Sequence, residues 1–171
     1  EICACLVGSE MCIRDSYKVK EASVRAVATG DNGAVWEDAC VEFFSIPAGD
    51  GIYYNVECNC AGTLLIGAGA GRENREHAPQ EVMDKVQRWS SLGRQSFEER
   101  VGECNWELAL VIPYSAFFKH QITSLDGKTV RANFYKCGDK LQTPHFLSWN
   151  PIALEKPNFH CPEFFGTLNF Q

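Results

Sequence analysis

The stretch Val35-Trp36-Glu37-Asp38-Ala39-Cys40-Val41-Glu42-Phe43-Phe44 decides the fold class. Successive side chains of a β-strand point to opposite faces of the sheet. One face is apolar, which predicts a surface packed on the core, and consists of Ala39, Val41 and Phe43. The other face is too polar for a core and is expected to meet solvent, a groove or a metal. It consists of Trp36, Asp38, Cys40 and Glu42.

Short alternating or apolar runs of the same kind recur along the chain between turn-like segments rich in Gly, Asn and Asp. They cover 23–28, 40–46, 53–60, 63–67, 106–112, 129–135 and 166–170. A single short helix is expected near 79–89, because Pro79 suits a first helical turn and Val82, Val86 and Trp89 fall on one helical face. Many strands with few helices predict an all-β fold, an antiparallel β-sandwich with jelly-roll-like or immunoglobulin-like layers.

Residues 1–16 differ from the rest of the chain. The run 6–16 resembles the in-frame translation of a sequencing adaptor and has neither a helical nor a strand period. We therefore expect 1–16 to be an artefactual leader outside the fold, whose deletion leaves the melting temperature nearly unchanged. Residues 17–171 are expected to form one N-terminally truncated domain, so that any signal peptide would belong to the missing N-terminus.

Composition excludes several classes of partner. The formal net charge of −6 argues against a nucleic acid or an anionic membrane surface. The chain has no apolar run of about 18 residues, so no membrane span is expected. Nine cysteines are present, but without a CxxC pair a zinc site gains little support. Disulfides remain an alternative to the mostly free, buried thiols that we expect.

Aromatic rings stand beside polar groups in two distant regions, around Trp36 and between 146 and 166. A sugar has an apolar face that suits a ring and many hydroxyls that suit polar side chains. Carbohydrate-binding candidates are therefore Trp36, Glu42, Trp149, Asn158, Phe159 and His160. For the three rings the alternative is packing in the core or at the end of the sandwich, and for Glu42 it is a purely structural carboxylate.

Carboxylates offer two further hypotheses. Asp38 and Asp50 lie at a strand end and a turn, where a structural Ca²⁺ could bind. A glycosidase needs two facing carboxyl groups, and Glu42 with Glu57 would supply them. Catalysis by a glycan-active hydrolase therefore stays open beside simple binding.

Several motifs together resemble the family 9 carbohydrate-binding modules, and more closely the family-9-like branch common in gut-type bacteria. The resemblance spans most of 17–171. Its landmarks are Trp36–Phe44, Tyr54–Asn59, Arg131–Tyr135, Ser148–Pro151 and Pro162–Leu168.

This resemblance implies a β-sandwich, bound calcium and a sugar held between two aromatic rings, Trp36 and Phe159. It assigns a sugar contact to Glu42, and it places Glu57 where the family has an arginine, a reversal of charge. The implied function is non-catalytic binding of an oligo- or polysaccharide in glycan degradation, in a secreted, periplasmic or cell-surface protein. A heme-binding electron-transfer domain of the same superfamily is the second alternative, with Met83 as the one methionine ligand outside 1–16.

Overall fold

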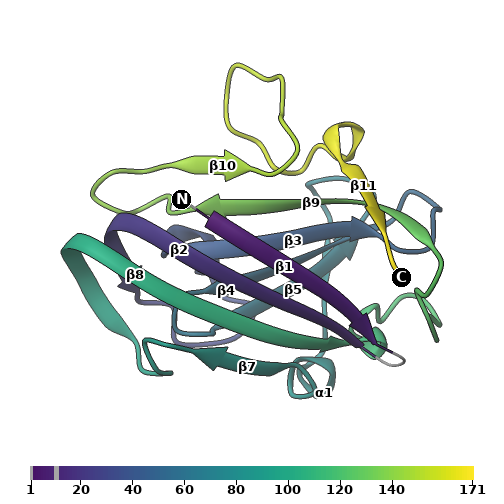
Figure 1. Cartoon of the computed structure of the whole chain (residues 1–171), viewed down its shortest axis with the longest axis horizontal. Helices are drawn as coiled ribbons and strands as arrows, with labels where there is room; N and C mark the ends of the chain where they lie inside the picture. The colour runs from purple at the N-terminus through teal and green to yellow at the C-terminus, as the bar shows by residue number, and fades with distance from the viewer. Residues whose placement is uncertain (1, 10–11) are drawn as a thin grey trace.

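The computed structural model describes residues 2–9 and 12–171. Two antiparallel sheets pack against each other as a β-sandwich (Figure 1), which confirms the predicted fold class. The first sheet has the strand order β1 (Ile2–Ser9), β2 (Cys12–Ala26), β8 (Phe97–Pro113) and β7 (Gln87–Ser90).

The second sheet carries the rest of the strands. Its order is β10 (Phe146–Ser148), β9 (Thr129–Cys137), β3 (Cys40–Ile46), β4 (Tyr53–Asn59), β5 (Leu64–Gly69) and β6 (Glu76–His77), and β11 (Gly166–Asn169) also pairs with β9. Short helical segments connect the strands: η1 (Val35–Glu37), α1 (Gln80–Met83), η2 (Tyr114–Ala116) and η3 (Pro162–Phe164). None of the helices in the described part of the chain has the length and hydropathy needed to cross a bilayer.

The main core lies between the two sheets, and β3 contributes to it as its alternation predicts. Ala39, Val41 and Phe43 are buried there, and Phe43 stacks on Phe134 of β9 with ring centroids 5.0 Å apart. The opposite face of the larger sheet carries a second aromatic cluster, made of Phe44, Tyr53, Tyr135 and Phe165. The chain after β10 packs on this outer face, where His160 and Phe165 contact Phe44, so the polar side of β3 is covered rather than open to solvent.

The helix expected near 79–89 is much shorter than its apolar period suggests. α1 ends at Met83, and Gln87–Ser90 form strand β7 against β8. Val82 and Val86 are buried, but the Trp89 side chain is 55% exposed. The prediction is wrong at its C-terminal end because pairing with the long strand β8 satisfies the backbone groups of 87–90.

The expectation that 1–16 lie outside the fold does not hold for 12–16, and residues 1, 10 and 11 lie outside the described residues. Strand β2 begins at Cys12, and its first residues pair with the end of β8, Ile13 opposite Ile112 and Asp15 opposite Leu110. Ile13 is fully buried in the main core. The inward-facing positions of β2 continue through this segment without a break, and β1 pairs with β2 in turn.

Replacing Ile13 with alanine tests this segment. Deleting most of a fully buried aliphatic side chain should lower the free energy of unfolding by about 2–4 kcal/mol, measured by urea denaturation. The control is Arg14→Ala, because the neighbouring side chain is exposed on the same strand and its loss should cost less than about 0.5 kcal/mol. Equal stability of the two variants would show that 12–16 are not part of the folded domain.

Candidate functional site

A pocket of about 420 Å³ lies on the outer face of the larger sheet, within the size range of small-molecule sites. Its floor comes from β3, β4, β5 and β9, and its walls come from the segments around 36, 72–77, 139 and 157–160. The lining residues are Trp36, Glu42, Asn55, Glu57, Leu65, Arg72, Arg75, His77, Cys137, Asp139, Phe146, Pro157, Asn158, Phe159 and His160.

Most of the residues predicted to bind carbohydrate converge on this pocket. It brings together Trp36, Glu42, Asn158, Phe159 and His160, although more than a hundred positions separate the first from the last. The convergence follows from sheet order, because β3 lies between β4 and β9 and the C-terminal segment crosses over all three. Their roles in binding remain predictions.

Two carboxyl groups stand side by side on the floor. Glu42 of β3 and Glu57 of β4 are directly opposite each other in the antiparallel register, and both are buried. Burial raises the pKa of both carboxyls, and for Glu42 the nearby Cys137 and Glu57 raise the pKa further. Glu42 Oε1 accepts a hydrogen bond from the Cys137 thiol at 3.0 Å.

Glu57 holds an unused hydrogen-bonding atom. Its Oε1 accepts from Asn55 Nδ2 at 2.8 Å, whereas its buried Oε2 has no hydrogen-bond partner within the described ranges 2–9 and 12–171. A buried polar atom without a partner costs about 1–3 kcal/mol. A hydroxyl donor that enters the pocket would remove this cost.

Arg75 is linked to the floor of the pocket by a hydrogen bond to Asn55, which in turn donates to Glu57. Arg75 Nε donates to Asn55 Oδ1 at 2.9 Å, and the Arg75 guanidinium lies 4.0 Å from the centroid of the Tyr53 ring. Gly67 makes room for this contact, since a Cβ there would lie 2.6 Å from Asn55 Oδ1. Gly67 belongs to strand β5.

Two aromatic rings are available at the walls of the pocket. Trp36 is on η1, beside the end of β3, and its side chain is 39% exposed. Phe159 is stacked on Tyr135, with centroids 4.1 Å apart and planes 5° apart. Tyr135 therefore covers one face of the Phe159 ring, Phe146 lies edge-on to it with centroids 6.2 Å apart, and Phe159 also lines the pocket.

His160 is fixed in its orientation by the protein. Its Nδ1 lies 2.9 Å from the Tyr53 hydroxyl, and its backbone N–H donates to Asn158 Oδ1 at 3.1 Å. Burial, reinforced by Arg75 and Arg72, lowers the pKa of His160 to about 4. At neutral pH the imidazole is thus uncharged, with one donor and one acceptor nitrogen.

Trp149 lies elsewhere on the protein. Its indole contacts the edge of Phe134 with centroids 5.9 Å apart, and a Cβ at Gly166 would come within 2.7 Å of Trp149 Cζ3. The ring is 51% exposed. Its packing on β9 and β11 holds it away from the pocket that gathers the other predicted residues.

The two aspartates predicted as metal ligands are held by hydrogen-bond donors. Asp38 Oδ2 accepts from the backbone N–H groups of Val27 and Ala28 and from Asn59 Nδ2, and Oδ1 is 3.4 Å from Arg25 Nε. Ca²⁺ takes six to eight oxygen ligands, so this ring of donors does not fit it.

Asp50 is placed no better for calcium. Its Oδ2 lies 2.9 Å from His120 Nε2, and its Oδ1 accepts from the backbone N–H of Ile52 at 3.0 Å. Calcium binding at Asp38 or Asp50 stays a prediction.

The sequence of the chain matches a known protein family. Residues 6–170 match the family described as carbohydrate-binding family 9. The chain belongs to this family. A search of curated proteins finds no match. The match confirms the predicted family, and it includes part of the segment expected to be a leader.

Solved structures agree with the assignment. A candidate carbohydrate-binding protein from Bacteroides uniformis is 66% identical to this family 9 module, with a TM-score of 0.97 over 100% of this chain and 78% of that chain. A family 9 module from Caldicellulosiruptor kristjanssonii, solved in complex with glucose, is 9% identical with a TM-score of 0.60, over 100% of this chain and 76% of that chain. The second likeness concerns the fold alone.

Proposed function

We propose that this family 9 module binds an oligo- or polysaccharide in the pocket without catalysis, and serves glycan degradation outside the cytoplasm. The observation that carries the proposal is the unpartnered Glu57 Oε2 on the floor of a pocket with aromatic walls. Such a site offers rings for the apolar face of a sugar and polar atoms for its hydroxyls.

Ring stacking supplies the apolar part of the proposed contact. Trp36 and Phe159 are aromatic side chains that line the pocket. A sugar ring that stacks on them removes apolar surface from water, at about 25 cal/mol for each Å² buried. Trp149, the third aromatic candidate, does not line the pocket and has no part in this arrangement.

Polar groups on the floor supply selectivity. Hydroxyl groups of the ligand would form hydrogen bonds with Glu57 Oε2 and His160. Glu42 and Asn158 line the same space. A site built around hydroxyls rejects an analogue that lacks one, because a buried polar group then stays unpaired. Arg72 and Arg75 line the pocket and add cationic hydrogen-bond donors. They supply guanidinium groups to the site, although Glu57 occupies the position where the family has an arginine.

The hydrolase alternative rests on the pair Glu42 and Glu57. Glycosidase carboxyls flank the scissile bond from two sides. Glu42 and Glu57 instead rise from adjacent strands on the same sheet face, so both approach a ligand from below. This placement favours binding over hydrolysis.

The heme alternative depends on Met83 as a ligand. Met83 is fully buried in the main core between the sheets. A side chain in that position does not reach a cofactor at the surface, so we do not propose heme binding.

A glycan array followed by titration calorimetry tests the proposal. The module should bind at least one glycan with one site per chain, and chromatography of that glycan after overnight incubation should return it unchanged. Binding with cleavage products that disappear in Glu57→Gln would support the hydrolase instead. Absence of binding to every glycan would contradict the proposed function.

Glu57→Ala should weaken glycan binding by about 10–100-fold, because a hydrogen bond to an ionisable group contributes about 1.5–3 kcal/mol. Calorimetry on the glycan identified above measures the change. Glu98→Ala is the matched control, since Glu98 is an exposed carboxylate on β8 in the other sheet. If Glu57→Ala binds the glycan with wild-type affinity, Glu57 Oε2 does not contact the ligand.

A further inference from the structure

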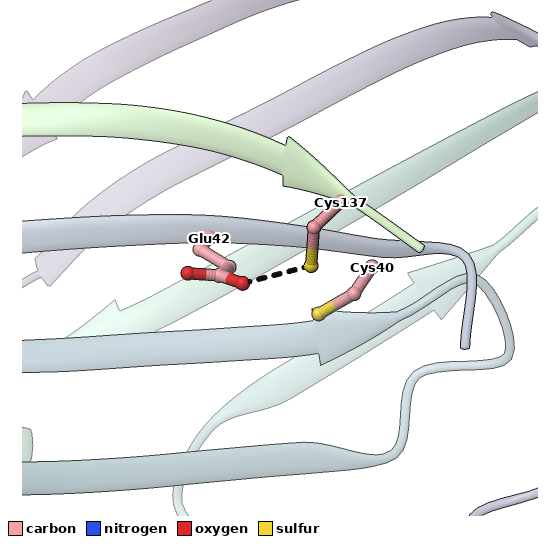
Figure 2. Close-up of side chains that lie close together, drawn as sticks. All are labelled: Cys40, Glu42 and Cys137. Atoms are coloured by element: carbon pink, nitrogen blue, oxygen red, sulfur yellow. Dashed lines mark hydrogen bonds between the residues drawn. The ribbon is translucent and has the colours of Figure 1, made fainter. Parts of the chain in front are cut away.

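Two cysteines and a glutamate meet beneath the pocket. Cys40 of β3 and Cys137 of β9 are directly opposite each other, and Glu42 follows two residues along β3 on the same face. Figure 2 shows the two sulfur atoms and the carboxylate pointing toward a common centre. One ligand atom from each of the three residues lies within 4.8 Å of the other two, and all three residues are buried.

We propose that Cys40, Cys137 and Glu42 bind a Zn²⁺ ion. Thiolate and carboxylate groups are both ligands of Zn²⁺, and two thiolates favour it over the hard cations Ca²⁺ and Mg²⁺. In a tetrahedral site with Zn–S bonds of about 2.3 Å, neighbouring sulfur ligands stand about 3.8 Å apart. The three ligand atoms lie within 4.8 Å of one another, so small side-chain adjustments would bring them to this spacing.

The ion can reach the cluster from the pocket. Glu42 and Cys137 line the pocket, and Cys40 lies below them with no exposed surface. Three protein ligands leave the fourth tetrahedral position for a water molecule. That position faces the pocket, because the sheet backbone occupies the other side of the cluster.

The arrangement of the strands keeps the other buried cysteines out of this cluster. The other buried thiols, Cys58 and Cys60, are on β4 and the turn after it, and Cys58 belongs to the main core on the opposite sheet face. Cys161 is buried near the aromatic cluster and is not part of the group. These cysteines therefore provide matched controls within the same chain.

Cobalt substitution tests the site directly. Co²⁺ is added to the fully reduced protein, and thiolate-to-cobalt charge-transfer bands in the near ultraviolet report the ligands. We expect one equivalent of Co²⁺ to give these bands and one equivalent of Zn²⁺ to remove them. Loss of a group that only hydrogen-bonds to a metal ligand lowers metal affinity about 10–100-fold, so loss of a ligand in Cys40→Ser or Cys137→Ser should lower it more than about 100-fold.

Controls separate this site from other sources of binding. Cys161→Ser should keep the bands, and Glu42→Gln should weaken binding while both sulfur ligands remain. A variant with Cys3, Cys5 and Cys12 all changed to Ser should bind as the wild type does. If circular dichroism shows that Cys40→Ser does not fold, the Co²⁺ affinities of Cys137→Ser and Glu42→Gln test the site instead.

Three results would overturn the proposal. One is the absence of Co²⁺ bands in the reduced wild-type protein. Another is unchanged binding in Cys40→Ser and Cys137→Ser. The third is a Cys40–Cys137 disulfide that survives a phosphine reductant, because a disulfide has no thiolates to offer. None of these results depends on glycan binding, so the zinc site and the proposed function fail or stand separately.

Discussion

Replacing Trp36 with alanine should abolish measurable glycan binding and leave the fold intact. The indole is 39% exposed on the short helical segment η1, so its removal takes little from the core. A ring stacked on a ligand contributes about 1–3 kcal/mol, by analogy with aromatic hot spots and base stacking. For a module of modest affinity this loss moves binding out of the range of titration calorimetry.

The other exposed tryptophans are controls for Trp36→Ala. Trp89 is 55% exposed on β7, and Trp149 is 51% exposed beside β9. Neither lines the pocket, so Trp89→Ala and Trp149→Ala should bind as the wild type does. Normal binding by Trp36→Ala, or loss of binding in Trp149→Ala, would place the sugar site elsewhere.

The largest expected effect on stability belongs to Asp15→Asn. Asp15 is buried, it accepts a hydrogen bond from the Tyr17 hydroxyl, and its Oδ1 has no hydrogen-bond partner in the described part of the chain. Burial raises the pKa of this carboxyl from 3.8 to about 7. The folded state therefore holds a proton that the unfolded state releases between these two pH values.

The difference between the folded-state and unfolded-state pKa of Asp15 determines how the stability changes with pH. A raised folded-state pKa makes the wild type lose stability as the pH rises from about 4 to about 7, by about 1.4 kcal/mol for each pH unit of difference between the two pKa values. Asparagine does not titrate, so the advantage of Asp15→Asn should grow by about 4 kcal/mol between pH 4 and pH 8. Urea denaturation at the two pH values measures it.

A surface aspartate provides the control for this comparison. Asp126 is exposed, so Asp126→Asn should change stability by the same small amount at both pH values. An Asp15→Asn advantage that does not vary with pH would mean that the carboxyl is not buried in the folded protein.

The sequence predicts the sandwich well because alternation reports burial directly. β3 has the predicted bounds Cys40–Ile46, and its apolar side packs in the main core as expected. The predicted free, buried thiols are found at Cys40, Cys58, Cys60, Cys137 and Cys161, whereas the free thiol of Cys104 is only half-buried. The apolar spacing of 82, 86 and 89 is helical, but pairing of 87–90 with β8 ends the helix at Met83.

The leader illustrates how tertiary pairing overrides local pattern. The 12–16 segment has no clear period alone, yet β8 extends to Pro113 and offers backbone partners as far as Cys12. A strand completed by a long neighbour needs little propensity of its own. A resemblance to an adaptor therefore says nothing about whether a segment is folded.

The site could be predicted only in part. The pairing of Trp36 with Phe159 came from family resemblance, since no local pattern joins residues that lie on separate segments. Arg75 was missed because its role depends on the loop after β5 folding back onto Asn55. The Cys40 and Cys137 pair was missed because only the register of β3 with β9 places the two thiols together.

The most direct measurement of the central claim is a nuclear magnetic resonance titration of the ¹⁵N-labelled module with its glycan. The chain has four tryptophans, so four indole N–H signals are expected, and single substitutions assign them. Binding in the pocket predicts that the Trp36 signal shifts in proportion to occupancy while those of Trp89 and Trp149 stay fixed. A shift of the Trp149 or Trp89 signal with Trp36 unmoved would contradict the account.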